Sequence, residues 1–257
     1  MSIERSVIVT PAFRKQSAFV EKIADVIELG YIKNVKSDDF KQKHTFSPSS
    51  IGYGHGTCPR YWFYALNGAN FQDTVNARGV ANMSYGTSAH ERIQKIFKES
   101  GILVSEEEEI LLSDPPIRGF IDLVIDVDGE IAPGEIKTAR QESWEIRLSS
   151  GKPIDYHLVQ ILIYMYAKQS KKGFFLYENK NTQEILLIEV ELTEKNQELL
   201  DRILNWLRKV YANYEADVLP ERPFTKKSKQ CKFCPLSDTC WKDKDGDVKI
   251  EKLDISV

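Results

Sequence analysis

The 257-residue chain has few cysteines, no excess of positive charge and no long uncharged apolar segment. Four cysteines are too few for a disulfide scaffold. The formal net charge of −3 means that any nucleic-acid contact must use a local patch. The most apolar uncharged segment, residues 156–167, is too short to span a bilayer. The N-terminus lacks a basic start followed by a long apolar core, so we expect no signal peptide, no membrane partner and a cytoplasmic protein.

The composition is typical of a globular protein. Apolar residues make up 42% of the chain and charged residues 28%, which is enough apolar material for a core and excludes a disordered chain. The length fits one large domain or two small ones.

Periodic patterns predict alternating helices and strands. Helical spacing marks four segments: residues 14–30, 86–99 (ended by Gly101), 153–171 and a long amphipathic segment capped by Thr193. Strand patterns mark five: residues 102–112, interrupted by the glutamates 106–109, then 117–127, 130–137, 173–178 and 184–192. Residues 34–57 look like a loop, and about the last twelve residues are charged and are expected to fray. The order predicts a mixed α/β domain.

Asp128-Gly129 predicts a two-residue turn between the second and third strands. The numbers of facing residues then add up to 257, which places Asp122 opposite Glu135, with Cβ atoms about 5 Å apart. Two carboxylates at this distance repel each other, and a divalent cation such as Mg²⁺ or Mn²⁺ would offset the repulsion. The alternative is a solvated acidic hairpin edge. A bulge at Pro133 would break this register.

Other polar side chains are expected near these carboxylates. Lys137 shares a face of its strand with the second carboxylate, where an ammonium group can orient a water and offset the charge of a phosphate. His90 lies on the inward face of its helix and is either a core histidine or a third metal ligand. His157, Gln160 and Tyr164 form one stripe of their helix, which either holds a phosphate or base or is an ordinary amphipathic surface. The glutamates 106–109 are interpreted as a solvated strand edge with no chemical role.

The cysteines are concentrated, since three of them form a Cys-x2-Cys-x5-Cys cluster. This spacing indicates a metal or iron–sulfur site in a reducing compartment. Two segments flank the cysteines and would together make a cationic, aromatic surface suited to single-stranded DNA. The alternative is a solvated lysine-rich loop and a core aromatic patch. The four cysteines are Cys58, Cys231, Cys234 and Cys240. The first flanking segment, Arg60, Tyr61 and Trp62, follows Cys58, and the second, with Lys226, Lys227 and Lys229, precedes Cys231.

Four short motifs together resemble the RecB-like exonuclease branch of the PD-(D/E)XK nuclease superfamily. Each motif is weak alone, but all four occur in the right order on the expected helix, strand, strand and helix. They are Gly86-x-x-x-His90, Gly119-x-x-Asp122, Gly134-Glu135-x-Lys137 and Gln160-x-x-x-Tyr164. The cysteine pattern, which begins Cys58-Pro59-Arg60-x-Trp62, is similar to that of the iron–sulfur subgroup, which includes CRISPR-associated RecB-like exonucleases, AddB-type nuclease domains and viral exonucleases.

The resemblance implies a restriction-endonuclease-like α/β core with a mixed central sheet flanked by helices. This nuclease domain would cover residues 46–241, with a helical extension over 1–45 and a charged tail over 242–257. One or two Mg²⁺ or Mn²⁺ ions would be held by His90, Asp122, Glu135 and the carbonyl of Ile136. Lys137 would position the attacking water, and Gln160 and Tyr164 would support the site or touch the strand.

The resemblance also implies that the four cysteines bind a [4Fe–4S] cluster that staples the helical N- and C-terminal parts together, because Cys58 precedes the core and the other three follow it. Four thiolates also suit Zn²⁺, which stays the alternative.

The implied activity is metal-dependent hydrolysis of single-stranded DNA ends, with 5′→3′ polarity, in recombination, end processing or CRISPR adaptation with a partner protein. The alternatives are a non-cleaving DNA- or partner-binding module and an endonuclease or nickase of the same fold. The sequence indicates no oligomeric state.

Overall fold

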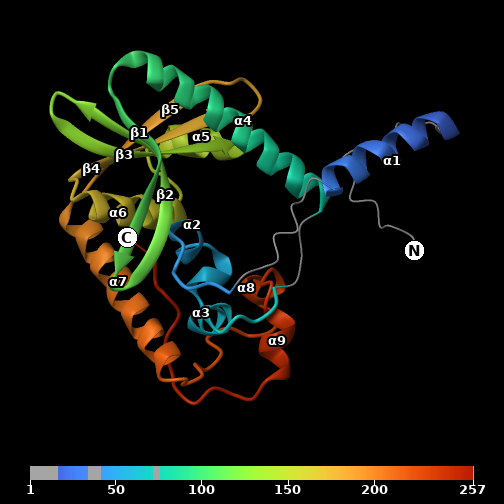
Figure 1. Ribbon diagram of the computed structural model, residues 1–257, viewed down its shortest axis with the longest axis vertical. Helices are drawn as coiled ribbons and strands as arrows, with labels where there is room; N and C mark the ends of the chain where they lie inside the picture. The colour runs from blue at the N-terminus through green and yellow to red at the C-terminus, as the bar shows by residue number, and fades with distance from the viewer. Residues whose placement is uncertain (1–16, 34–41, 72–75, 257) are drawn as a thin grey trace.

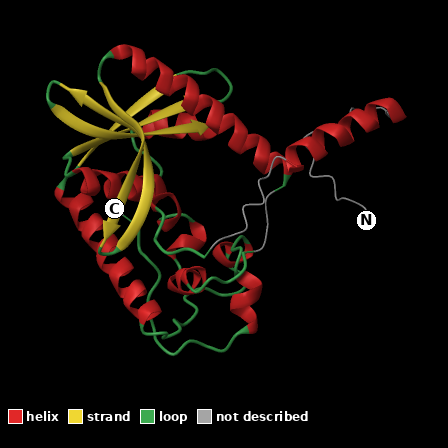
Figure 2. Ribbon diagram, in the orientation of Figure 1, coloured by secondary structure: helices red, strands yellow, loops and turns green. Residues whose placement is uncertain are grey.

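The computed structural model describes residues 17–33, 42–71 and 76–256. Its centre is one five-stranded sheet in the order β1-β2-β3-β4-β5. The first three strands form an antiparallel meander, β4 runs parallel to β3, and β5 is antiparallel to β4 (Figures 1 and 2). The strands are β1 (Leu103–Ser113), β2 (Pro116–Val127), β3 (Glu130–Ala139), β4 (Lys172–Asn179) and β5 (Ile185–Glu191).

Helices cover both faces of this sheet. Helix α4 lies across one face, and α6 with α7 lies on the other (Figure 1). Short helices before β1 and after α7 pack together beside the sheet. The helices are α1 (Ala18–Lys33), α2 (Pro48–Ile51), the 3-10 helix η1 (Gly54–Thr57), α3 (Pro59–Leu66), α4 (Ala77–Ser100), α5 (Gln141–Ser150), α6 (Asp155–Lys168), α7 (Glu194–Glu215), α8 (Lys229–Lys232) and α9 (Ser237–Lys242).

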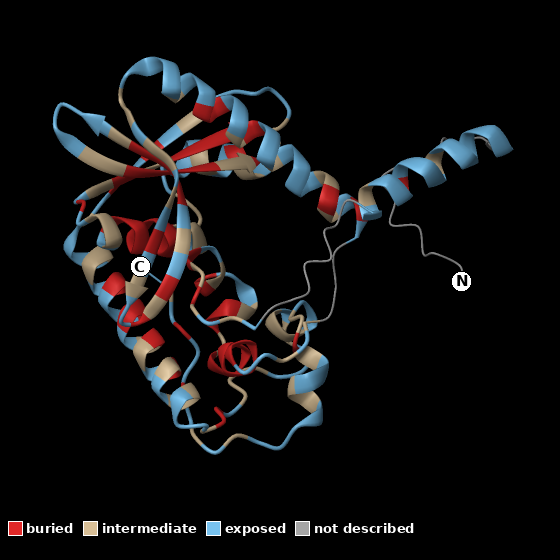
Figure 3. Cartoon of the chain, in the orientation of Figure 1, coloured by how far each residue is buried: buried red, intermediate tan, exposed pale blue. Residues whose placement is uncertain are grey.

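The apolar core follows these layers. A small cluster under α4 consists of Ile93, Leu123, Ile136 and Leu176. The main cluster joins the other face of the sheet to α3, α6 and α7. Helix α3 is buried on all sides, unlike the other helices (Figure 3). None of the described helices combines the length and apolarity that a membrane span requires.

The predicted hairpin register is confirmed from Val127–Glu130 to Leu123–Gly134. Asp128 and Gly129 have φ values of 55° and 86°, the left-handed pair that a type I′ turn needs. Pro133 keeps its place in the register and causes no bulge.

Several element boundaries differ from the prediction. Helix α4 begins at Ala77 because the Asn76 side chain caps it by accepting from the Gly79 N–H at 3.0 Å. Strand β1 continues through the glutamates 106–109 with a register shift near Ser105. Helix α6 spans less than predicted, since Gln169 takes a left-handed conformation at its end. Helix α5 was missed because it has almost no apolar periodicity, with one buried residue.

The N-terminal predictions are tested in part. Residues 14–16 of the first predicted helix and 34–41 of the predicted loop lie outside the described residues. Within the described part, α1 lies where a helix was predicted, and the predicted loop contains the short helices α2 and η1.

The C-terminal segment does not fray, contrary to the prediction. Ile250 and Leu253 are buried, and the Leu253 N–H donates to the Thr57 carbonyl at 2.9 Å. Val248 pairs with Pro220 in an isolated bridge. The apolar residues between the charges decide this outcome, because they bury surface against a segment that is distant in sequence.

Candidate active site

The two predicted carboxylates meet where β2 and β3 separate. The ladder between these strands ends at Leu123 and Gly134, since β3 pairs with β4 from Gly134 onwards. The pairing thus ends one pair short of the predicted contact between Asp122 and Glu135. In its place the Ile136 N–H donates to Oδ2 of Asp122 at 2.7 Å. Both carboxylates are buried and line the same cavity.

Two motif glycines permit the close packing around this junction. A Cβ on Gly119 would lie 2.9 Å from Pro48 and 3.2 Å from Tyr164. A Cβ on Gly134 would lie 2.1 Å from the Phe174 ring. Larger residues would therefore push α2, α6 or β4 away from the strands that carry the carboxylates.

Glu135 is held in one orientation. Its Oε1 accepts from Lys137 Nζ at 2.5 Å and from Gln160 Nε2 at 2.7 Å. Gln160 also donates to Tyr164 Oη at 3.2 Å, and Tyr164 Oη donates to the Phe120 carbonyl at 2.7 Å. Oε2 of Glu135 is buried and has no hydrogen-bond partner among the described residues. The carboxylate therefore keeps one oxygen without a donor, an arrangement that costs free energy unless a ligand or a proton shared with the Asp122 carboxyl satisfies it.

His90 lies next to Asp122, and Glu107 of β1 joins them as a third side chain that could bind a metal ion. His90 Nδ1 is 3.6 Å from Asp122 Oδ1, and one ligand atom from each of His90, Glu107 and Asp122 lies within 4.8 Å of the others. Gln94 ties the group together by donating to Glu107 Oε1 at 2.8 Å and to the Asp122 carbonyl at 3.1 Å. Nitrogen and carboxylate ligands of this kind suit a divalent cation.

Glu107 was assigned no chemical role from the sequence. Glu106 pairs with Leu123 and Glu108 with Ile121, so Glu107 lies opposite Asp122 across the β1–β2 ladder. The signal in the sequence was the run of glutamates on a strand next to β2, but the run alone does not say which glutamate faces the site.

Burial shifts the titration of these groups. It raises the pKa of Asp122 and of Glu135 above the ordinary carboxyl range, and Lys137 partly offsets the shift. Burial also lowers the pKa of His90, which favours the neutral imidazole that a metal requires. A bound cation would favour the ionised carboxylates.

A cavity of about 740 Å³ opens over the carboxylates. Gln160, Tyr164, Lys43, Arg118 and Phe120 are among the residues that line it. His157 belongs to the predicted stripe, but its Nδ1 pairs with Tyr177 Oη at 2.8 Å and it does not line this cavity.

The predicted aromatic and cationic surface is not formed. Arg60, Tyr61 and Trp62 are buried because α3 packs against α7 and the C-terminal segment, so they are core residues here. Lys226, Lys227 and Lys229 are exposed, and their contact with DNA stays a prediction.

The four cysteines line one small pocket between the start of α3 and helices α8 and α9. The thiols of Cys58, Cys231, Cys234 and Cys240 are free. Burial raises the pKa of Cys58 to about 12 and that of Cys234 to about 11. The structure thus brings the cysteines to one place without showing a cluster.

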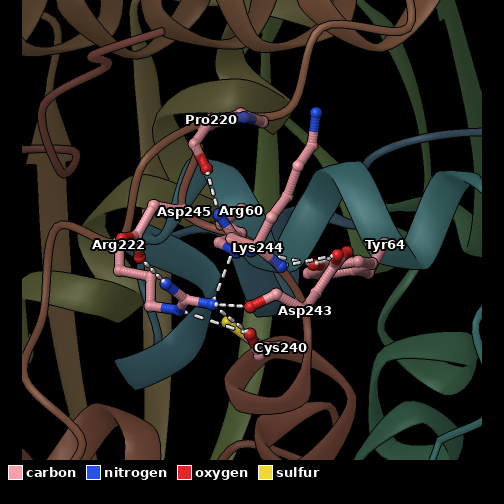
Figure 4. A network of polar contacts seen from close by, with 8 residues as sticks. All are labelled: Arg60, Tyr64, Pro220, Arg222, Cys240, Asp243, Lys244 and Asp245. Carbon is pink, nitrogen blue, oxygen red and sulfur yellow. Dashed lines mark hydrogen bonds and ion pairs between the residues drawn. The ribbon is translucent and has the colours of Figure 1, made fainter. Parts of the chain in front are cut away.

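A network of arginines supports this pocket (Figure 4). Arg60 donates to the carbonyls of Pro220 and Lys244 at 2.8 and 2.6 Å and to Tyr64 Oη at 3.0 Å. Tyr64 Oη donates to Asp243 Oδ2 at 2.7 Å. Arg222 donates to the carbonyl of Cys240 at 2.8 Å and to that of Asp243 at 2.6 Å. These bonds fasten α3 to the C-terminal segment.

Comparisons with known proteins agree with this geometry. The model of the PD-(D/E)XK nuclease superfamily matches residues 104–241. An alkaline exonuclease, LHK-Exo from Laribacter hongkongensis, is 14% identical, with 70% of this chain and 95% of that chain covered and a TM-score of 0.51. LHK-Exo in complex with dAMP is 15% identical, with 67% and 89% covered and a TM-score of 0.50. The structure of SSO0001 is 18% identical, with 88% and 97% covered and a TM-score of 0.45. At these identities the two LHK-Exo structures show a shared fold and nothing beyond it.

Proposed function

Because the chain belongs to the PD-(D/E)XK nuclease superfamily, we propose that it is a metal-dependent exonuclease that hydrolyses single-stranded DNA from the 5′ end. The observation that carries the proposal is the unpartnered Oε2 of Glu135 beside the group of His90, Glu107 and Asp122. A buried carboxylate oxygen without a partner fits a missing cation ligand. The exonuclease activity of the similar solved structure LHK-Exo is consistent with this choice.

We assign the Mg²⁺ or Mn²⁺ ligands to His90, Glu107, Asp122, Glu135 and the Ile136 carbonyl. A bound divalent ion supplies a polarised phosphate and a water of lowered pKa. The first four side chains converge from α4, β1, β2 and β3, so the site depends on the sheet and on α4 together.

The remaining residues act on Glu135 and on the reactants. Lys137, ion-paired with Glu135 and lining the cavity, holds the attacking water and offsets the charge of the phosphate. Gln160 fixes the rotamer of Glu135, and Tyr164 fixes Gln160 and the backbone of β2.

The experiment compares the wild-type protein with Asp122→Asn on 5′- and 3′-labelled single strands, with Mn²⁺ or with EDTA. We expect cleavage to need Mn²⁺ and to fall by about 10³-fold in the variant. Asp126→Asn is the matched control, because Asp126 is exposed on the same strand and serves only the turn by accepting from the Gly129 N–H. Undiminished cleavage by Asp122→Asn contradicts the site.

The same assay tests exonuclease action and polarity. A 5′→3′ exonuclease releases the 5′ label first and leaves a closed circular single strand intact. Cleavage of the circle supports the endonuclease alternative, and binding without cleavage under all conditions supports a non-cleaving module.

The proposal includes a [4Fe–4S] cluster on the four cysteines, supported by their placement around one pocket. Protein purified without oxygen is then brown and contains iron and sulfide in equal amounts, and Cys234→Ser loses both. A colourless protein with stoichiometric zinc contradicts the cluster in favour of the zinc alternative.

We also place the start of the nuclease domain at residue 46 and its biological context in recombination, end processing or CRISPR adaptation with a partner protein. The domain extends beyond the predicted end at residue 241, because Ile250 and Leu253 are buried. A protein that lacks residues 1–41 is expected to keep its thermal midpoint and its cleavage rate. Loss of folding in this truncated protein would overturn the domain boundary.

A further inference from the structure

Phe120 is an exposed aromatic side chain at the edge of the active-site cavity. It lies on β2 two residues before Asp122, with 44% of its side chain exposed, and it lines the same cavity. Residues two apart on a strand share one face of the sheet. A large apolar ring is therefore presented to solvent next to the predicted metal ligand, where a core position would have buried it.

One cation–π contact holds the ring, and one hydrogen bond holds its backbone. The guanidinium of Arg118 lies 5.3 Å from the ring centre, and Arg118 Nε pairs with Glu109 Oε1 at 2.5 Å. The Phe120 carbonyl accepts from Tyr164 Oη, which belongs to the network that orients Glu135. The backbone of Phe120 is thus tied to the network that orients Glu135, and Arg118 packs against the ring.

The lining of the cavity also supplies positive charge. Lys43 lines the cavity from a segment that lies beside β2, since Phe46 bridges to Ile117 and its carbonyl accepts from the Arg118 N–H at 3.0 Å. The lining of the cavity therefore combines carboxylates with a lysine, an arginine and an exposed aromatic ring. This combination fits a nucleotide, whose phosphate is anionic and whose base has two flat apolar faces.

We infer that Phe120, backed by Arg118, is a stacking platform for the base adjacent to the scissile phosphate. The inference rests on the proposed nuclease function and adds its substrate determinant. Stacking on an aromatic ring does not discriminate between bases, because each base has a π face. It requires an accessible base face, which any base of a flexible single strand can offer and a duplex offers only at its terminal pair, so the platform favours single-stranded over paired DNA ends.

The experiment measures binding and cleavage separately. Binding of a fluorescein-labelled thymidine oligonucleotide is followed by anisotropy in EDTA, where no hydrolysis occurs, and KM and kcat are measured with Mn²⁺. We expect Phe120→Ala to raise Kd and KM about 5- to 100-fold with little change in kcat, and Phe120→Trp to restore both. The control is Leu187→Ala, since Leu187 is 64% exposed on β5 and lies outside the cavity.

An oligonucleotide with abasic sites at its terminal positions makes the test specific to stacking. The wild-type protein should bind it about 5- to 100-fold more weakly than the intact oligonucleotide, which is the factor expected for Phe120→Ala. The Phe120→Ala variant should bind the two oligonucleotides equally. Equal binding by the wild-type protein overturns the platform, and so does a Phe120→Ala variant that still discriminates. If the wild-type protein cuts no DNA, the proposed function fails, while the anisotropy in EDTA still decides whether Phe120 stacks on a base.

Discussion

The carboxylate site and the cysteine pocket are assembled in opposite ways. The carboxylates lie on neighbouring strands of one meander, so short turns bring them together. The pocket unites Cys58 with cysteines that follow the whole sheet, and hydrogen bonds between distant segments hold it (Figure 4). Local pairing therefore builds the first region, and long-range packing builds the second.

The two regions also differ in what they do for stability. The carboxylate site buries like charges and leaves one oxygen of Glu135 without a partner. In the cysteine region, Arg60 uses both terminal nitrogens to fasten the C-terminal segment. We conclude that the scaffold tolerates strain at the first region for the sake of ligand binding, while the second region contributes to the free energy of unfolding.

Arg60→Met should have the largest effect on stability. If it has little effect, the cysteine region does not stabilise the fold and the contrast between the two regions fails. The substitution removes a fully buried guanidinium, leaves the carbonyl of Pro220 without this donor and leaves the carbonyl of Lys244 with Arg222 alone. We expect a loss of about 3 kcal/mol, which lowers the thermal midpoint by about 9 °C, and faster proteolysis after residue 242. Arg208→Met, which removes an exposed ion pair with Asp114, is the control and should change the midpoint little.

Gln160→Leu tests the carboxylate site, where we expect a loss of function with little loss of stability. The variant loses the hydrogen bond that orients Glu135, and it places an apolar side chain of similar size on a buried helix face. We expect Mn²⁺ affinity and kcat to fall about 10- to 100-fold, with a small change in thermal midpoint. Titration with Mn²⁺ and steady-state kinetics measure this, and Gln197→Leu on α7 is the control. An unchanged Mn²⁺ affinity would remove Gln160 from the site.

The pH dependence of stability tests the buried charges directly. Burial raises the pKa of Asp122 and Glu135 in the folded state above the ordinary carboxyl values of the unfolded chain. The folded protein therefore binds more protons, and the stability that protonation supplies is lost as the pH rises through the raised pKa values.

In EDTA, the fall in thermal midpoint between pH 5 and pH 8 should be smaller for Asp122→Asn than for the wild-type protein, by about 3 °C. Mn²⁺ should restore the wild-type midpoint at pH 8. Identical pH profiles for the two proteins would show that burial does not raise the pKa of Asp122, and Asp126→Asn should follow the wild-type profile.

Gly86→Ala should give the smallest effect. A Cβ on Gly86 meets no atom within 4 Å, so this motif glycine is not required for packing in α4. We expect a gain of about 1 kcal/mol, seen as a rise in thermal midpoint, with cleavage unchanged. Gly119→Ala is the contrasting variant and should lower the midpoint, because its Cβ would lie 2.9 Å from Pro48. A loss of cleavage in stable Gly86→Ala would point to a close approach of substrate to α4.

The fold was predictable where pattern and turn chemistry are local. The type I′ turn at Asp128 fixed a register that the structure confirms as far as Gly134. The alternating strands and the cap at Thr193 were likewise readable, while α5 was missed because its single buried residue, Trp144, leaves no periodic signal.

The candidate site was predictable in part. The motifs placed His90, Asp122 and Glu135 on the right elements, but nothing local indicated that β1 would bring Glu107 to them. The register of β1 against β2 decides this, and the glutamate run hides it because each of its four positions has the same chemistry.

By itself the sequence determined which residues carry charge, sulfur and apolar surface, and which short segments would turn, extend or coil. The tertiary structure alone decided which of these reach solvent. Arg60 and Trp62 became core residues while Phe120 stayed exposed at the cavity. The physical reason is that burial depends on the segments that pack from elsewhere in the chain, and neither residue type nor spacing contains that information.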